Sequence, residues 1–439
     1  MSGPVVDKVP SSIEQPTRAA VVVIGGGIAG VATAFSLAQR GVDVALCEKG
    51  EIAGEQSSRN WGWVRKQGRD PREIPLILAS MQIWAGLNAT VGAETGFRTT
   101  GNIALSVTEG DIDRRIAWLE HARQHQLDSR LISGAEANRL MPGSAVKFVA
   151  GIYTASDGQA EPQKAVPAIA RAAQALGATI LTQCAVRGLE TTAGKISAVV
   201  TERGRIDCDS VVLAGGAWSR LFCGNLGIDL PQLKIRSGAL RTEPVAGGPE
   251  IAAITDSIAF RRRLDGGYTI ANFLMQAEIV PDSFRLFRTF LPQLRKEGAN
   301  LKLRVTGQFA AELRRPRTWA LDAASPFEQL RTLDPAPWTA DAEAAKARLA
   351  ELFPVFRGVK VAQHWGGMIE ASPDAIPIIS PVAALPGFFL ATGFSGHGFG
   401  TGPGAGRLMA DLVTGAPPIV DPTPFRFDRF GVTSGVGWS

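Results

Sequence analysis

The first part of the chain shows a strand, turn, helix and strand pattern of hydrophobic and polar positions. The run 21–24 is β-branched throughout, which is typical of a strand buried on both faces. A glycine-rich stretch, 25–30, follows directly and opens an apolar helix predicted from about Ile28 to Gln39. A second strand is predicted from Val42 to Cys47 and ends at Glu48. This order predicts a β-α-β unit.

The glycine-rich stretch satisfies the GxGxxG pattern with Gly25, Gly27 and Gly30. The first glycine permits a tight turn, the second lets a pyrophosphate approach the backbone, and the third allows close helix packing. The helix start, including Ile28 and Ala29, directs unpaired amides at an anion. Glu48 lies 18 residues after Gly30 and suits a ribose diol. We predict a dinucleotide site; the alternative is a glycine turn without a ligand.

Two further strand ends carry small residues. The run 210–213 leads into Ala214, Gly215 and Gly216, as close backbone approach to a cofactor requires; tight structural packing is the alternative. A strand over 387–393 leads into a glycine loop, 394–403, and a helix from about Gly404 to Leu412. The start of this helix suits an electron-rich group, such as the pyrimidine edge of a reduced flavin.

The remaining pattern predicts two interleaved domains. We expect an α/β fold, α+β overall, in which a Rossmann-like cofactor domain comprises 19–98, 152–225 and 361–439. A discontinuous substrate domain on a mixed or antiparallel sheet comprises 99–151 and 226–360. Residues 1–18 are predicted to be a flexible or surface-lying tail. No internal repeat and no run of transmembrane length is visible.

Composition narrows the setting of the protein. Hydrophobic residues make up 45% of the 439 residues and charged residues 20%, as in a folded soluble protein. The four cysteines show neither a disulfide framework nor metal-ligand spacing, and a reduced, cytoplasmic setting without a metal is expected. The first 18 residues contain no apolar stretch long enough for a signal peptide.

The net charge of +5 is concentrated in residues 284–317. This segment holds two glutamates and nine cations, a local charge of +7: Arg285, Arg288, Arg295, Lys296, Lys302, Arg304, Arg314, Arg315 and Arg317. Interleaved Phe and Leu residues make part of it amphipathic. It is either a peripheral membrane contact or a solvated helix whose apolar side is ordinary core. No nucleic-acid partner is predicted.

Several stretches together resemble the flavin-dependent D-amino acid oxidase and sarcosine oxidase superfamily, and are most similar to bacterial L-amino acid deaminases. The resemblance covers nearly the whole chain after the tail. It is carried by the segments Glu48-Lys49-Gly50-Glu51-Ile52-Ala53-Gly54-Glu55-Gln56-Ser57-Ser58-Arg59, 185–191, 219–222, 325–328, and Pro373-Asp374 followed by Pro377-Ile378-Ile379.

The resemblance implies noncovalently bound FAD. It assigns FAD binding to the glycine turn and to Glu48, Lys49, Gln56, Ser57, Ser58, Val186, Gly215, Gly396, Gly398, Gly400 and Thr401. It also implies that Arg261 binds a substrate carboxylate, because a planar guanidinium can do so bidentately. A solvated arginine cluster with Arg262 and Arg263 is the alternative. His397 is expected either to orient the substrate or stabilise charge near the flavin, or to have a structural role.

The expected reaction is oxidation of an α-amino acid by hydride transfer from Cα to flavin N5, followed by imine hydrolysis to a 2-oxo acid and ammonia. The alternatives are a secondary-amine or D-amino acid dehydrogenase of the same superfamily and a noncatalytic FAD-binding subunit.

Gly400 stands where sarcosine oxidases carry a lysine that promotes reaction with oxygen. A quinone or respiratory electron acceptor is therefore favoured over dioxygen. The related deaminases carry an N-terminal signal or anchor that this sequence does not show. The expected location is cytoplasmic, with possible peripheral contact at the inner membrane face through 284–317.

Overall fold

A computed structural model describes residues 3–298 and 301–431. The glycine turn belongs to a six-stranded sheet in which β1 (Val21–Ile24) lies between β13 (Ser210–Leu213) and β2 (Val44–Cys47). Next to β2 lies β9 (Thr179–Leu181), and next to β13 lies β22 (Phe388–Thr392), all five strands running parallel. β21 (Ile378–Pro381) pairs antiparallel with β22 at the edge. The predicted strands of this region therefore form one parallel sheet.

The two faces of this sheet are covered differently. Apolar helices cover one face: α1 (Ile28–Ala38), α6 (Pro162–Ala175) and α13 (Gly398–Thr414), with α3 (Ile74–Val91) packed on α13. A three-stranded meander lies near the other face: β10 (Val186–Thr192), β11 (Lys195–Thr201) and β12 (Gly204–Asp207). Each side has its own buried cluster of aliphatic and aromatic residues.

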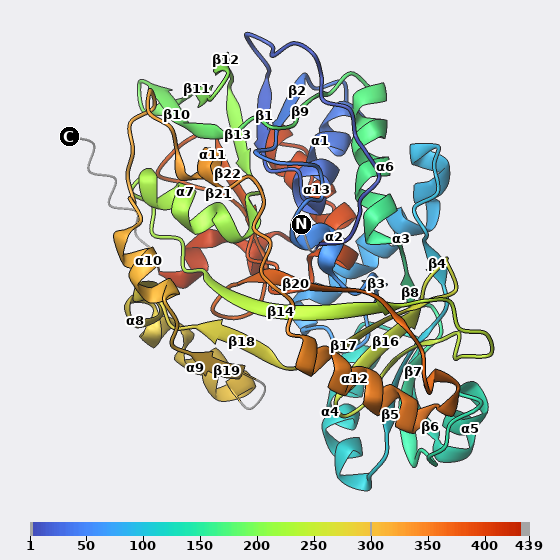
Figure 1. Cartoon of the computed structure of the whole chain (residues 1–439). Helices are drawn as coiled ribbons and strands as arrows, with labels where there is room; N and C mark the ends of the chain where they lie inside the picture. The colour runs from blue at the N-terminus through green and yellow to red at the C-terminus, as the bar shows by residue number, and fades with distance from the viewer. Residues whose placement is uncertain (1–2, 299–300, 432–439) are drawn as a thin grey trace.

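A second sheet of ten strands is mixed, as predicted. In order it contains β19 (Leu301–Arg304), β18 (Met275–Glu278), β14 (Leu233–Thr242), β17 (Tyr268–Asn272), β16 (Ile258–Arg262), β15 (Ala252–Ile254), β5 (Asn102–Ser106), β7 (Ala150–Thr154) and β6 (Ser129–Ser133), and β20 (Val361–Ala371) pairs with β14. Figure 1 shows β14, a long strand of this sheet, crossing the middle of the molecule. The predicted fold class is confirmed; the exact domain boundaries stay a prediction.

Shorter elements surround this framework. They are α2 (Gln56–Arg59), β3 (Trp63–Val64), β4 (Arg98–Thr99), α4 (Ile112–Gln124), α5 (Gly134–Leu140), β8 (Gly158–Gln159), α7 (Ser219–Asn225), α8 (Pro281–Arg285), α9 (Phe287–Glu297), α10 (Gln308–Arg314), α11 (Pro326–Gln329) and α12 (Thr339–Leu352). The segment of charge +7 thus folds into α9, β19 and α10 together with the end of α8.

Helix α13 begins at Gly398, six residues before the predicted start at Gly404. Its glycines allow close packing that side chains would block. A Cβ on Gly402 would lie 2.3 Å from Ile28 Cγ1, and one on Gly406 would lie 2.4 Å from the carbonyl carbon of Ala32. The glycine-rich composition of this stretch favours a loop, and packing against α1 therefore stabilises it as a helix.

The described part of the tail adopts the surface-lying alternative. The Ser12 N–H donates to the Ile180 carbonyl oxygen at 2.7 Å, and the Asp7 N–H donates to that of Gln163 at 3.0 Å. These bonds hold the tail along β9 and the start of α6.

Within residues 3–298 and 301–431, one helix has the length and composition to span a membrane, which was not expected from the sequence. Residues Pro71–Val91 have a mean hydropathy of 1.4. Several of its apolar side chains, including Leu76, Ile77 and Trp84, are buried, and α3 packs on α13. Buried core helices can have the same length and hydropathy, and α3 packs as a core helix.

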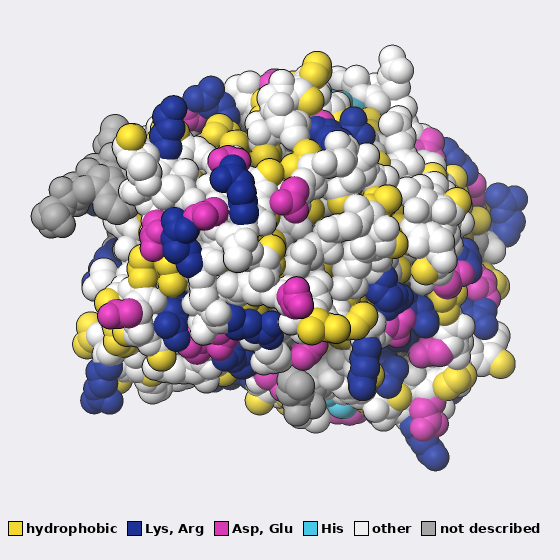
Figure 2. Space-filling view, turned by 90° about the horizontal axis from the view of Figure 1, so that it is seen from above, with side chains coloured by type: hydrophobic (Ala, Val, Ile, Leu, Met, Phe, Trp, Pro, Cys, Tyr) yellow, Lys and Arg dark blue, Asp and Glu magenta, His cyan; other side chains and the backbone are white. Residues whose placement is uncertain are grey.

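Charged side chains of both signs are interspersed on the face shown in Figure 2. On the α8–α10 segment, Phe284, Phe287 and Leu313 are more than half exposed (68%, 53% and 64%). Only part of the apolar side of this segment is therefore buried in the core.

Candidate active site

The glycine turn is closed by backbone contacts that exclude side chains. Gly25 has φ of +112°, and a Cβ there would lie 2.4 Å from the Ala214 carbonyl oxygen. A Cβ on Gly30 would lie 2.0 Å from the Gly25 carbonyl oxygen. Gly27 caps the N-terminus of α1. The turn thus offers bare backbone next to the first turn of a helix, which suits an anion.

Two side chains fix this turn. Glu48 Oε2 accepts the Gly26 N–H at 2.6 Å, and its Oε1 accepts the Gly50 N–H at 2.7 Å. Ser57 Oγ accepts the Ile28 N–H at 2.8 Å. Burial raises the pKa of Glu48. Glu48 therefore organises the turn through backbone amides, and its contact with a ribose stays a prediction.

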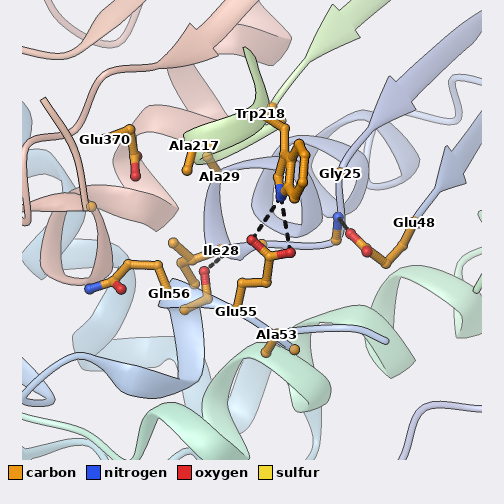
Figure 3. A pocket seen from close by; sticks show the side chains of 18 of the residues that line it. Gly25, Ile28, Ala29, Glu48, Ala53, Glu55, Gln56, Ala217, Trp218 and Glu370 are labelled. Carbon is orange, nitrogen blue, oxygen red and sulfur yellow. Dashed lines mark hydrogen bonds between the residues drawn. The ribbon is translucent and has the colours of Figure 1, made fainter. Parts of the chain in front are cut away.

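A cavity extends from this turn across the carboxyl ends of the parallel strands, where open α/β sheets bind ligands. Figure 3 shows it from close by, with Gln56, Glu55 and Glu370 around it. Among its lining residues are Gly25, Gly27, Ile28, Ala29, Glu48, Lys49, Gln56, Ser57, Val186, Gly215, Gly396 and Gly398, each predicted to bind the cofactor.

Four other predicted cofactor residues do not line this cavity. Gly30 packs on the turn, Ser58 donates to the Glu55 carbonyl oxygen, and Thr401 Oγ1 donates to that of His397. The Gly400 carbonyl oxygen accepts hydrogen bonds from Ser80 and Trp84. These four residues thus make contacts within the protein and do not face the cavity.

The cavity fits a dinucleotide with a flavin. Gln56 Oε1 is buried without a hydrogen-bond partner, so a ligand donor would satisfy it. The far end is lined by Phe394, Gly396 and Phe399, which suits an aromatic ring system. The residues present therefore match FAD.

A second cavity, with a volume of about 790 Å³, borders the same loop. Ser395 and His397 line it, whereas Gly396 and Gly398 between and beside them line the first cavity. Its walls include apolar side chains of β14, β18, β20 and α9, for example Ile235, Met275, Ile369, Phe287 and Phe290. The loop therefore separates a cofactor cavity from a space large enough for a substrate.

Charged groups gather in this second cavity beside the loop. His397 Nδ1 lies 3.0 Å from Glu73 Oε2, and Glu73 is buried. Burial is the main cause that lowers the pKa of His397, and its ring is therefore neutral at pH 7. Burial alone would raise the pKa of Glu73, but His397 and Arg69 outweigh this effect and hold the pKa of Glu73 below its usual value. Arg69 is buried, and its Nη1 has no hydrogen-bond partner. The cluster thus contains one cationic N–H donor without a hydrogen-bond partner among the described residues.

Arg261 has a different place from the one expected of a carboxylate-binding residue. Its Nη1 and Nη2 bind Glu161 Oε1 and Oε2 at 2.9 and 3.1 Å, and its side chain is 1% exposed. The pKa of Glu161 is lowered to about 2, because the Arg261 charge outweighs the effect of burial. Arg261 lines neither cavity. Its guanidinium already has a carboxylate within the protein.

Sequence reasoning missed Arg69, Glu73 and Glu370. The sequence did offer a signal for Arg69: it belongs to a group of cations in residues 65–72, shortly after the predicted cofactor-binding segment that ends at Arg59. Glu370 precedes the Pro373-Asp374 motif by three residues and lines the cofactor cavity. Glu73 showed no signal, because its pairing with His397 joins residues 324 positions apart.

Comparison with known proteins gives the family. The model of the DAO family, FAD dependent oxidoreductase, matches residues 20–412. Glycine oxidase from Pseudomonas putida is 28% identical over 92% of this chain and 97% of its own length. The structure of L-amino acid deaminase from Proteus myxofaciens, in complex with anthranilate, has a TM-score of 0.94 and 38% identity over 97% of this chain and 96% of that one. L-amino acid deaminase from Proteus vulgaris has a TM-score of 0.92 and 34% identity, over 96% of this chain and 100% of that one. The chain thus belongs to the DAO family of FAD-dependent oxidoreductases, and it is an enzyme that uses FAD to oxidise CH–NH groups of amino acids or amines.

Proposed function

We propose that the enzyme oxidatively deaminates an α-amino acid to a 2-oxo acid and ammonia. The observation that carries this proposal is the 790 Å³ cavity beside the cofactor loop, which combines apolar walls with the guanidinium of Arg69, whose Nε donates to the Arg65 carbonyl oxygen but whose Nη1 has no hydrogen-bond partner. A carboxylate would satisfy Arg69, and an apolar side chain would fit the walls. The similarity to L-amino acid deaminases supports the same substrate class.

In this proposal the protein positions the substrate and manages one proton. Arg69 takes the carboxylate-binding role expected of Arg261. His397 Nδ1–H donates to Glu73, so that Nε2 carries the lone pair and accepts a proton from the substrate ammonium. FAD, when bound, would accept the hydride from the substrate. The apolar walls exclude water until the imino acid is formed. FAD is held without a covalent bond.

The electron acceptor in this proposal is a quinone of a membrane rather than dioxygen. A side chain at Gly400 would meet the Trp63 carbonyl oxygen at 3.1 Å and Arg69 Nη2 at 3.4 Å, which leaves little room for a lysine. The exposed apolar residues and cations of α8–α10 support peripheral contact with an anionic membrane, at its cytoplasmic face.

The experiment that tests this function is an anaerobic screen of the yellow protein with both enantiomers of the amino acids, together with glycine, sarcosine, dimethylglycine and proline. Flavin absorbance should bleach with L- or D-amino acids that carry apolar side chains. Bleaching by the N-methylated compounds alone would favour the secondary-amine dehydrogenase. Failure of every α-amino acid to bleach the flavin would refute oxidative deamination.

A further inference from the structure

Glu370 is one of the carboxyl groups that line the cofactor cavity, together with Glu48, Glu51 and Glu55, among backbone amides and apolar side chains. It lies near the end of β20, is 8% exposed, and in Figure 3 points toward the space between Gln56 and Ala217. The backbone N–H groups of Glu370 and of Phe394, in the loop between the cavities, favour the ionised form of this carboxyl, against the effect of burial on its pKa. Among the described residues, no side chain donates a hydrogen bond to this carboxyl, and no cation lies within 4.0 Å of it.

The charged groups on the elements packed against Glu370 already have partners or face elsewhere. Lys234, opposite Glu370 on β14, lies 3.2 Å from Glu312. They also include Arg236, stacked on Trp338; Arg59, paired with Asp334; Glu55, which accepts from Lys49 and Trp218; and His397, bound to Glu73. Among the described residues, no charged side chain thus pairs with a negative charge on Glu370, and only the two backbone N–H groups favour it.

These surroundings favour the neutral acid. Burial, assisted by the negative charge of Glu55, raises the pKa of Glu370 to about 7. The pyrophosphate of FAD brings further negative charge into the same cavity, and an ionised carboxylate there would be repelled. A neutral carboxyl group instead carries one O–H donor, and that donor needs an acceptor when it is buried. FAD offers several acceptors in its phosphates, its ribityl chain and its flavin carbonyls.

We propose that Glu370 enters the loaded cofactor site as a neutral carboxylic acid and donates its O–H to an acceptor of FAD. Binding of FAD is then linked to protonation. Protein with ionised Glu370 takes up one proton when it binds FAD, and the FAD-bound protein releases that proton when FAD dissociates. The inference concerns the cofactor alone and holds whichever amine is oxidised.

The test measures the dissociation constant for FAD from pH 6 to pH 9, using the full-length holoprotein and the fluorescence of released FAD. Above the pKa of Glu370, the wild-type constant should rise about tenfold for each pH unit; below it, the constant should be flat. Glu370→Gln keeps an N–H donor in place and should bind FAD independently of pH. Glu55→Gln is the matched control, because it removes another carboxyl that lines the cavity. Its constant should still rise about tenfold for each pH unit, but from a lower pH, because the Glu55 charge no longer raises the pKa of Glu370.

A second readout uses the wild-type protein alone. Release of FAD above pH 8 should be accompanied by release of nearly one proton per cofactor, and calorimetry in two buffers of different ionisation enthalpy counts it. The proposal is overturned if Glu370→Gln follows the wild-type pH dependence or loses FAD at every pH. It is also overturned if the wild-type constant rises toward acidic pH, since Glu370 would then bind the cofactor as the carboxylate.

Discussion

Arg69 and Arg261 are both buried arginines, and their partners decide their roles. Arg261 is neutralised by Glu161, whereas Arg69 keeps a donor at the edge of a large cavity. The sequence contains both residues, yet Glu161 lies 100 positions before Arg261, so their pairing was not visible in any local pattern. The residues that line the first cavity were easier to predict, because the glycine turn, Glu48 and Ser57 lie within 33 positions and contact one another through the local backbone. Their binding of FAD stays a prediction.

Replacing Arg69 with Met should weaken substrate binding. The variant removes a charge-assisted hydrogen bond worth about 1.5–3 kcal/mol, so KM for an α-amino acid should rise roughly tenfold to a hundredfold. The corresponding amino acid amide, which lacks the carboxylate, should be affected much less. Steady-state kinetics with both substrates measures the difference.

Two further arginine variants serve as controls for Arg69→Met. Arg72→Met removes a half-exposed arginine paired with Asp70 and Asp374 and should leave KM unchanged. Arg261→Met should mainly destabilise the fold, by about 3–5 kcal/mol, because it leaves the buried Glu161 charge uncompensated. A normal KM for the amino acid in Arg69→Met would contradict carboxylate binding by Arg69. A rise of KM for the amino acid, but not for its amide, in Arg261→Met would support Arg261 as the carboxylate-binding residue.

At the scale of elements, most strands and helices were predictable and the glycine-rich segment was not. The strands of the parallel sheet are short runs with clear boundaries, and β1 and β13 begin and end where the pattern places them. Helix α13 differs, because its propensity opposes a helix and its packing requires one. The glycines that suggested a loop are those that let α13 approach α1, so the outcome depended on a contact between distant parts of the chain.

The elements α8 to α10 form the surface that we expect to contact a membrane. Val305 (81% exposed) and Leu313 (64% exposed) belong to this surface and line neither cavity. The double variant Val305→Ser, Leu313→Ser should bind vesicles containing phosphatidylglycerol at least tenfold more weakly, because each buried aliphatic side chain contributes about 1.5–3 kcal/mol. Vesicle cosedimentation at low salt measures the affinity.

A matched variant at the opposite end of the mixed sheet controls for general loss of surface hydrophobicity. Leu131→Ser, Val149→Ser changes two exposed residues of comparable type (46% and 41% exposed) and should leave vesicle binding intact. Equal binding of all three proteins, or binding that does not depend on the anionic lipid, would contradict the membrane contact.

At the scale of the whole molecule, two sheets meet at a loop that serves both cavities. The parallel sheet supplies the glycine turn, and the β14–β20 pair of the mixed sheet supplies Glu370 to the cofactor cavity and Ile369 to the substrate cavity. Successive residues of one strand point to opposite faces, so β20 forms a wall of each. The arrangement places the two cavities on either side of residues 394–398.

The most direct test of oxidative deamination is a single anaerobic turnover with the best amino acid from the screen. Flavin bleaching, 2-oxo acid and ammonia should appear in equal amounts, and deuterium at Cα should slow the bleaching, because that C–H bond is broken as the flavin is reduced. Bleaching without ammonia, or at a rate unaffected by deuterium, would contradict hydride transfer from the Cα of an α-amino acid.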